Sequence, residues 1–107
     1  MPRGISGMGD LVRQAQRMQS KMAEVQASLK ERVVEGTAGG GMVTVLVNGQ
    51  QEPVAVKIDP EVIDPNDPAL LEDLILAASR QALQKSKELA NEEMSKVTGG
   101  MNMPGMF

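Results

Sequence analysis

The sequence contains no cysteine, histidine, tryptophan or tyrosine, and its single phenylalanine is Phe107. Without cysteine there is no disulfide and no thiolate metal site. Without histidine, the most common metal ligand and the usual general base near neutral pH are missing. Aromatic side chains normally supply large buried areas, so Val, Leu, Ile, Ala and Met must form the core. We therefore expect no enzyme activity, no small-molecule substrate and no metal or other cofactor.

Long hydrophobic runs are also missing. The N-terminal residues have no apolar stretch long enough for a signal peptide, and no later segment is long enough to cross a bilayer. We expect a cytoplasmic protein that does not enter a membrane. At 107 residues the chain predicts one small domain, and chains of this size often gain stability by associating with a second copy.

The central stretch, residues 42–59, predicts a β-hairpin. Apolar residues alternate with other residues on both sides of Asn48-Gly49, which is typical of half-buried strands joined by a tight turn. With a two- or a four-residue loop, one face of the hairpin carries only β-branched side chains, and helices are needed to cover it: Val43, Val45, Val47, Val54, Val56 and Ile58. The opposite face is mixed and is expected to be partly wet.

Two long helices flank this hairpin. Apolar residues at spacings of three and four predict a first helix from about Leu11 to Glu31 with Asp10 as its N-cap, and residues 1–9 are interpreted as a mobile arm. Asp67 and Pro68 predict the start of a second helix that continues to about Val97. Residues 32–38 predict a first strand, residues 39–41 a turn, and residues 99–107 a flexible Met/Gly/Pro tail. The fold class is therefore α+β: an α-β-β-β-α chain with a three-stranded antiparallel meander, in which residues 10–98 form a single domain.

Helix length favours a homodimer. A strand of six or seven residues covers roughly 20 Å, whereas the second helix spans roughly 45 Å. The sheet therefore cannot shield either helix from end to end. A seam continues along the first helix and is predicted to pack in the dimer or the core: Leu11, Met18, Met22, Val25 and Leu29. The alternative is that the two helices shield each other within one chain.

Charge is unevenly distributed although the net charge is only −3. Residues 1–34 carry six basic and three acidic side chains, whereas residues 35–79 carry one basic and eight acidic side chains. Local sign, rather than the sum, decides where a polyanion can bind. Arg13, Arg17 and Lys21 recur at four-residue steps and form a stripe away from the seam. The alternative interpretation is an ordinary solvated helix face.

Other motifs favour structure over chemistry. The glycines at 36 and 39–41 lack the following Lys-Ser/Thr and the helix that a phosphate loop requires. Carboxylates between 59 and 67 do not have calcium-loop spacing and suit a helix-capping linker. The helical serines, Ser86 among them, have no histidine to activate them and are interpreted as surface residues.

The order of these segments resembles a known family. The segments VEGTAGGGMVTV, KIDPEVI, LLEDLILAA and the MPGMF ending are similar to the YbaB/EbfC family of bacterial nucleoid-associated proteins. The resemblance covers nearly the whole chain. It implies a tweezer-like homodimer that binds double-stranded DNA with little sequence specificity, alters its conformation in the nucleoid, and is not an enzyme. By position it implies six DNA-binding candidates on the two helices: Arg13, Arg17, Lys21, Arg80, Lys85 and Lys87.

This implied function covers nucleoid organisation, gene regulation and DNA protection. The alternative function is a dimeric scaffold whose helices hold another protein and never contact DNA. A stoichiometric protein partner together with no DNA binding at low salt would favour the scaffold.

Overall fold

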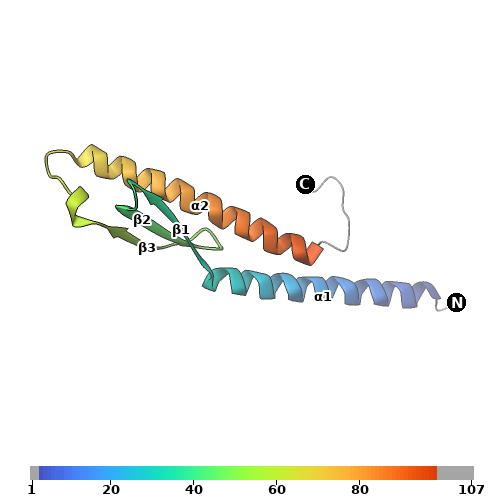
Figure 1. Ribbon diagram of the computed structural model, residues 1–107. Coiled ribbons are helices and arrows are strands. Elements are labelled where there is room, and N and C mark those ends of the chain that lie inside the picture. The colour runs from blue at the N-terminus through green and yellow to red at the C-terminus, as the bar shows by residue number, and fades with distance from the viewer. Residues whose placement is uncertain (1–2, 99–107) are drawn as a thin grey trace.

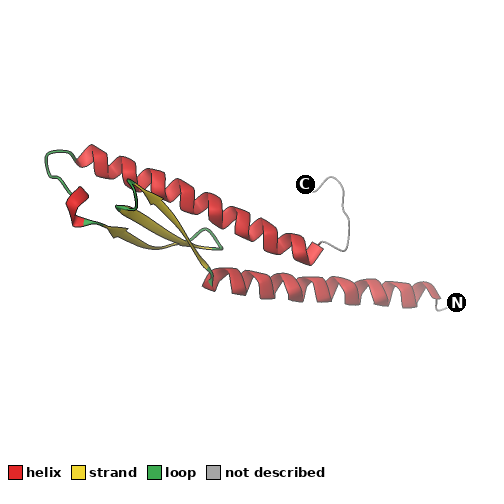
Figure 2. Ribbon diagram, in the orientation of Figure 1, coloured by secondary structure: helices red, strands yellow, loops and turns green. Residues whose placement is uncertain are grey.

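The computed structural model describes residues 3–98, with side chains described from residue 7 onward. The chain runs α1 (Arg3–Glu31), β1 (Val33–Ala38), β2 (Val43–Asn48), β3 (Pro53–Ile58), the short 3₁₀ helix η1 (Pro60–Val62) and α2 (Pro68–Thr98). As Figures 1 and 2 show, α2 lies along the sheet, and α1 leaves the sheet beside the C-terminal half of α2. This architecture confirms the predicted α-β-β-β-α order and the α+β class.

The sheet is the predicted antiparallel meander, in the order β1-β2-β3. The central strand β2 is where the core forms, because Val43, Val45 and Val47 are at most 3% exposed. Their side chains pack with Ala78 and Ala82 of α2. The alternation that predicts a half-buried strand is therefore confirmed in β2, with α2 as the covering helix.

The third strand departs from the prediction that all six hairpin residues are covered. Val56 pairs with Val45 as the parity requires, but a bulge between Leu46 and Val47 shifts the register next to Val54. Val54 and Val56 are 55% and 50% exposed. The physical reason is that α2 packs on β1 and β2. The edge strand β3 lies outside the area that α2 covers, so its apolar side chains remain exposed to solvent.

The hairpin turn uses a different left-handed residue from the one expected. The sequence places the tight turn at Asn48-Gly49, whose residue types tolerate a positive φ, but the residue with a positive φ in this turn is Gln51, at 62°. Gly49 is needed for a close approach instead, since an added Cβ would lie 2.8 Å from the carbonyl oxygen of Leu29. The Asn48 side chain closes the turn by accepting from the backbone N–H groups of Gln50 and Glu52 at 2.9 and 3.1 Å.

Ser86 corrects another prediction, because it is fully buried rather than a surface residue of the helix. Its hydroxyl donates to the carbonyl oxygen of Asn48 at 2.6 Å. It also accepts from the backbone N–H and the side-chain amide of Gln51, at 3.2 and 3.0 Å. A buried hydroxyl is tolerated when its hydrogen bonds are made, and here those bonds fasten α2 to the hairpin turn.

Helix α2 begins as predicted and packs unusually close to the sheet. Asp67 accepts from the N–H of Leu70 at 3.3 Å as a cap, and Pro68 is the first helical residue. At Gly36 of β1, an added Cβ would lie 2.1 Å from the carbonyl oxygen of Ala78 and 2.4 Å from the nitrogen of Ala82. Only glycine on the strand, facing alanines on the helix, allows this separation.

Helix α1 begins at Arg3, well before the predicted start at Leu11. Residues 3–9 are therefore helical, and the interpretation of residues 1–9 as an arm outside the helix is wrong there. Asp10 lies inside the helix, so it is not the N-cap. Each glycine costs a helix interior only about 1 kcal/mol, and the apolar repeat continues through these residues. The predicted flexible tail at 99–107 lies outside the described residues.

The molecule is long and thin, with Cα extents of 80 × 25 × 16 Å and a radius of gyration of 20.9 Å. A compact chain of this length has a radius of gyration of about 13 Å. The excess comes from α1, whose N-terminal half extends past the last turn of α2 (Figure 1). The expectation that the helices are too long for the sheet to cover is confirmed.

Candidate nucleic-acid interface

The projecting half of α1 carries three of the predicted DNA-binding residues. Arg13, Arg17 and Lys21 are all exposed. Successive residues of a helix turn by about 100°, so a four-residue step shifts the side chain by only about 40°. The three cations therefore follow one slowly turning line along the helix, as the sequence predicted.

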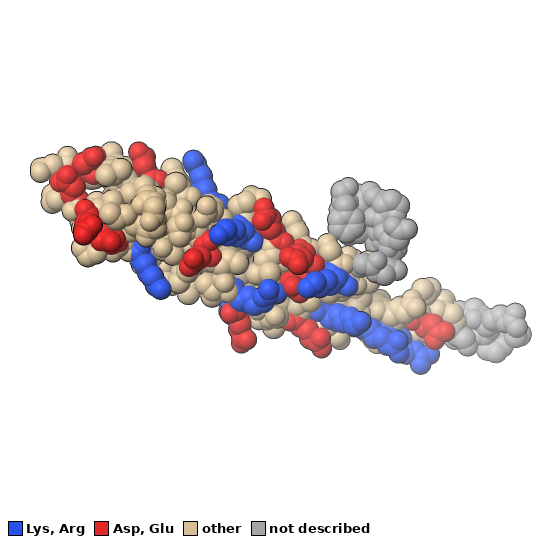
Figure 3. Space-filling view, viewed as in Figure 1, with Lys and Arg blue, Asp and Glu red and all other residues tan. Residues whose placement is uncertain are grey.

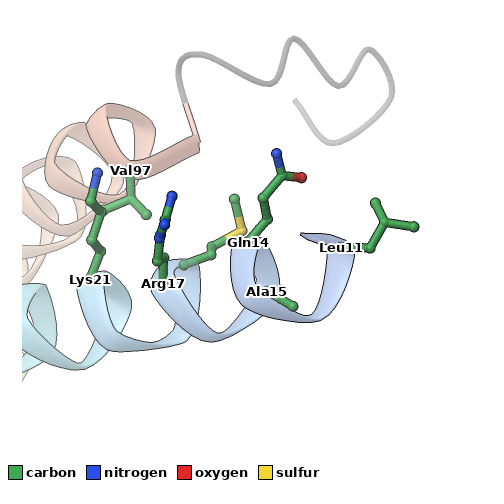
Figure 4. Close-up of a pocket in the computed structure, with 7 residues that line it drawn as sticks. Leu11, Gln14, Ala15, Arg17, Lys21 and Val97 are labelled. Atoms are coloured by element: carbon green, nitrogen blue, oxygen red, sulfur yellow. The ribbon is translucent and has the colours of Figure 1, made fainter. Parts of the chain in front are cut away.

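This basic line borders an open groove between α1 and the end of α2. The groove has a volume of about 450 Å³ and is lined by Leu11, Gln14, Ala15, Arg17, Met18, Lys21 and Val97. In Figure 4 the Arg17 and Lys21 side chains point from α1 toward the Val97 side of the groove. The prediction that the stripe lies away from the apolar seam is wrong here, because Arg17 and Lys21 share the groove with Leu11 and Met18.

A second hollow lies further toward the N-terminus, where Asp10, Arg13, Gln14 and Arg17 meet around about 320 Å³. The Arg13 guanidinium donates to the Asp10 carboxylate at 3.0 Å, with both side chains at least 67% exposed. Exposed pairs of this kind contribute little to stability, but the carboxylate competes with any phosphate for Arg13. The sequence alone did not predict this ion pair, because Asp10 was interpreted as an N-cap. The signal was present, since residues three apart in a helix are close enough to pair.

The three candidates on α2 are exposed but do not form one surface. Arg80 and Lys87 are seven residues apart and therefore lie on the same side of α2, about 20° apart. Lys85 is two residues from Lys87 and points to nearly the opposite side. The two hollows beside α1 include none of these three residues. The structure therefore brings together the α1 candidates, and separately Arg80 with Lys87.

Two further cations pair with Glu93, and one of them, Arg32, links the base of α1 to α2. Glu93 of α2 accepts from Arg32, which directly follows α1, at 2.9 Å, and from Lys96 at 3.1 Å. These two hydrogen bonds, that from Arg32 first, hold the pKa of Glu93 below its usual value. Among the described side chains, the ion pairs involve Arg13, Arg32 and Lys96, so Arg17 and Lys21 have no carboxylate partner there.

The predicted seam packs only toward its C-terminal end. Leu29 is 1% exposed, whereas Leu11 is 65% and Met22 is 37% exposed. Met18 and Val25 lie between these limits. The exposed part of the seam coincides with the part of α1 that extends beyond α2, because no other element of the protomer reaches it.

Acidic side chains gather at the opposite end of the molecule, where β3 leads through η1 into α2, while basic atoms line much of the visible side of α1 (Figure 3). Within residues 3–98, no helix is long and apolar enough to cross a bilayer. Across the same range, no three acidic side chains are placed so that they could hold a metal ion together.

Comparison with known proteins decides the family. A family model described as the YbaB/EbfC DNA-binding family matches residues 4–101. The chain belongs to the YbaB/EbfC family. A nucleoid-associated protein of Alkaliphilus metalliredigens is 47% identical over 97% of this chain and 91% of that protein. One from Clostridium novyi is 49% identical over 97% of this chain and 96% of that protein.

The fold of this YbaB/EbfC chain is also similar to that of a solved structure. An uncharacterized protein from Helicobacter pylori superposes with a TM-score of 0.60 at 21% identity, over 83% of this chain and 96% of that one. At this level of identity the likeness supports the fold alone. The resemblance inferred from the sequence motifs is confirmed.

Proposed function

We propose that this chain is a nucleoid-associated protein of the bacterial cytoplasm that binds duplex DNA as a homodimer. Residues 10–98 supply both DNA binding and dimerisation, and the paired helical arms alter the conformation of the DNA with little demand on its sequence. Roles in nucleoid organisation, gene regulation and DNA protection follow from such binding. Membership of a DNA-binding family supports the ligand, and the exposed basic line on α1 is the single structural observation that carries the proposal.

The basic line on α1 is suited to binding the phosphates of the DNA backbone. Arginine and lysine side chains neutralise backbone phosphates and release condensed counterions, which gives affinity without base readout. Arg17 and Lys21 are exposed, lie on one line and have no carboxylate partner among the described residues. Arg80 and Lys87 form a second exposed pair on α2, with Lys85 on another side of that helix. The net charge of −3 does not by itself oppose this, because six of the acidic side chains lie between residues 59 and 73, at the end of the molecule away from the basic line.

Exposed apolar surface supports the homodimer. β3 is an edge strand with exposed Val54 and Val56, and exposed apolar residues continue in the segment that follows, at Ile63, Leu70 and Leu76. Large apolar residues that stay exposed in succession commonly mark an association surface. In a symmetric dimer the same surface of each protomer forms the interface. The N-terminal half of each α1 helix then projects from the dimer and stays free to contact DNA.

The experiment is a mobility shift across a salt series with paired charge-reversal variants. Arg17→Glu with Lys21→Glu should abolish the shift, while Lys30→Glu with Lys57→Glu changes the net charge equally and should leave most of the binding. Both pairs are exposed, so folding should survive in each. Equal binding by the two variants would show that the α1 line does not contact DNA.

The second candidate function is a dimeric scaffold for another protein. The observation that favours it is the exposed apolar surface on the arm, where Met8, Leu11 and Val12 are 68%, 65% and 54% exposed. A stoichiometric protein partner, together with no DNA shift even at low salt, would support the scaffold over the nucleoid-associated function.

A further inference from the structure

The groove beside α1 is half apolar and open in the protomer. Leu11, Ala15 and Met18 of α1 and Val97 of α2 supply its apolar wall, and Arg17 and Lys21 stand at its border. Leu11 is 65% exposed. Exposed apolar area of this kind is stabilised when another apolar group covers it. The lining therefore suits an occupant with apolar side chains and no positive charge.

The chain itself continues from this groove. Val97 lines it, and the last turn of α2 ends one residue later at Thr98. The nine residues that follow, GGMNMPGMF, contain no charged side chain and four large apolar ones: Met101, Met103, Met106 and Phe107. Nine residues reach up to about 30 Å when extended. The stretch of α1 from Lys21 to Leu11 is only about 15 Å long, so the segment is long enough to follow the whole groove.

We propose that residues 101–107 dock into the groove of their own chain. Methionine side chains are flexible enough to fill an irregular hollow. The aromatic ring of Phe107 can lie against the Arg17 guanidinium or the Lys21 ammonium, which are attracted to its face. Because the segment carries no charged side chain, docking adds no side-chain charge to the apolar wall of the groove, and Arg17 and Lys21 at its border can keep their charged ends in water.

Tethering favours this segment over a second copy of the chain. A peptide that begins two residues from its site has an effective concentration in the millimolar range, well above that of any separate molecule in dilute solution. The exposed valines of β3 lie on a different element, so dimerisation through them leaves the groove free for the tail.

Docking has a consequence for DNA, which rests on the proposed function. Arg17 and Lys21 line the groove, so a docked tail and a phosphate backbone compete for the same surface. The tail then acts as a built-in competitor, which DNA must displace to reach these two cations.

The absence of native cysteine allows a direct test by disulfide formation in the full-length chain. Met103→Cys is combined with Gln14→Cys, which lines the groove. The matched control combines Met103→Cys with Gln16→Cys, an equally exposed glutamine two residues away on nearly the opposite side of α1. The groove pair should form the intramolecular disulfide at least about tenfold faster than the control, and the two rates should become equal in urea.

Non-reducing electrophoresis separates the outcomes. Equal rates for the two pairs in the folded protein would overturn the proposal, as would a product with the mass of two chains, which would mean that another copy fills the groove. Added duplex DNA should slow the groove pair. If the wild-type protein shows no mobility shift with DNA, the proposed function fails, while the disulfide rates without DNA still decide whether the tail docks.

Discussion

Asp10 pairs with one of the three cations of the basic line on α1. Its carboxylate lies 3.0 Å from the Arg13 guanidinium and borders the same hollow as Arg17. A phosphate that approaches Arg13 has to displace this partner and is also repelled by its charge. Of the three cations, Arg13 is therefore the least available for binding phosphate in the free protein. The four-residue spacing in the sequence does not distinguish it from Arg17 and Lys21.

Asp10→Asn should tighten DNA binding. The substitution frees Arg13 and removes a negative charge, and exposed pairs of this kind are worth up to about 1 kcal/mol, or about fivefold in affinity. Fluorescence anisotropy with a labelled duplex at low salt measures this change in DNA affinity. Glu61→Gln makes the same charge change in η1, at the acidic end, and should alter affinity little. Weaker binding by Asp10→Asn would mean that Asp10 orients Arg13 toward DNA.

Replacing either of two glycines by alanine should change the stability of the fold, but in opposite directions. At Gly36 the new methyl group meets the backbone of α2 at 2.1 and 2.4 Å, and overpacking of this kind costs about 1–3 kcal/mol. At Gly7, inside exposed α1, nothing lies within 4 Å, and alanine should gain about 1 kcal/mol from its helix propensity. Thermal unfolding should show a lower Tm for Gly36→Ala and a raised Tm for Gly7→Ala. A raised Tm for both would mean that α2 does not approach β1 this closely.

At the scale of the elements, Glu93 fixes the base of the α1 arm. It accepts hydrogen bonds from Arg32, at the junction of α1 and β1, and from Lys96 of its own helix. Both bonds favour the ionised carboxylate, which is why the pKa of Glu93 is lowered. The Arg32–Glu93 pair and buried Leu29 are among the contacts at the junction where α1 meets the rest of the protomer.

Stability should therefore depend on pH through Glu93. A depressed pKa means that the folded state favours the ionised form, so the contribution is present above the ordinary value of 4.5 and is lost as pH falls through the lowered value. Glu93→Gln lacks this dependence. The difference in Tm between wild type and Glu93→Gln should be constant near neutral pH and shrink at acid pH. A difference that stays unchanged down to pH values well below the ordinary one would exclude the two bonds as its source.

Which elements the sequence could predict follows from how local their signals are. The strands and the start of α2 were predictable because alternation in β2 and the Asp67-Pro68 cap are properties of neighbouring residues. The start of α1 was not, because Gly4, Gly7 and Gly9 resemble a breaker although the helix tolerates them. The burial of Ser86 and the exposure of Val54 were also unpredictable, since both depend on where α2 crosses the sheet, and a strand pattern alone does not record that.

At the scale of the whole molecule, the elongated shape supports the proposed homodimer. A radius of gyration of 20.9 Å against about 13 Å for a compact chain leaves a large surface for a small core. The sequence alone indicated this imbalance from helix and strand lengths, and family membership from its motifs. It could not show that the cations and the seam border one groove, because that depends on α2 ending beside the middle of α1.

Val56→Lys should dissociate the proposed homodimer. Val56 is 50% exposed in the protomer, so lysine is tolerated in a monomer, but burial at an interface would leave its charge without a partner. Val12→Lys is the matched control, because Val12 of α1 is 54% exposed and lies away from β3. Sedimentation analysis should show a monomer for Val56→Lys and a dimer for wild type and Val12→Lys. A dimeric Val56→Lys variant would place the interface elsewhere.

The salt dependence of DNA affinity tests the central claim most directly. If Arg13, Arg17 and Lys21 of both protomers contact phosphates, the logarithm of the binding constant should fall with the logarithm of salt concentration with a slope of about −5. Arg17→Gln with Lys21→Gln should reduce that slope to about −2, because about four contacts are lost. A slope near zero for the wild type, or the same slope in both proteins, would contradict the account.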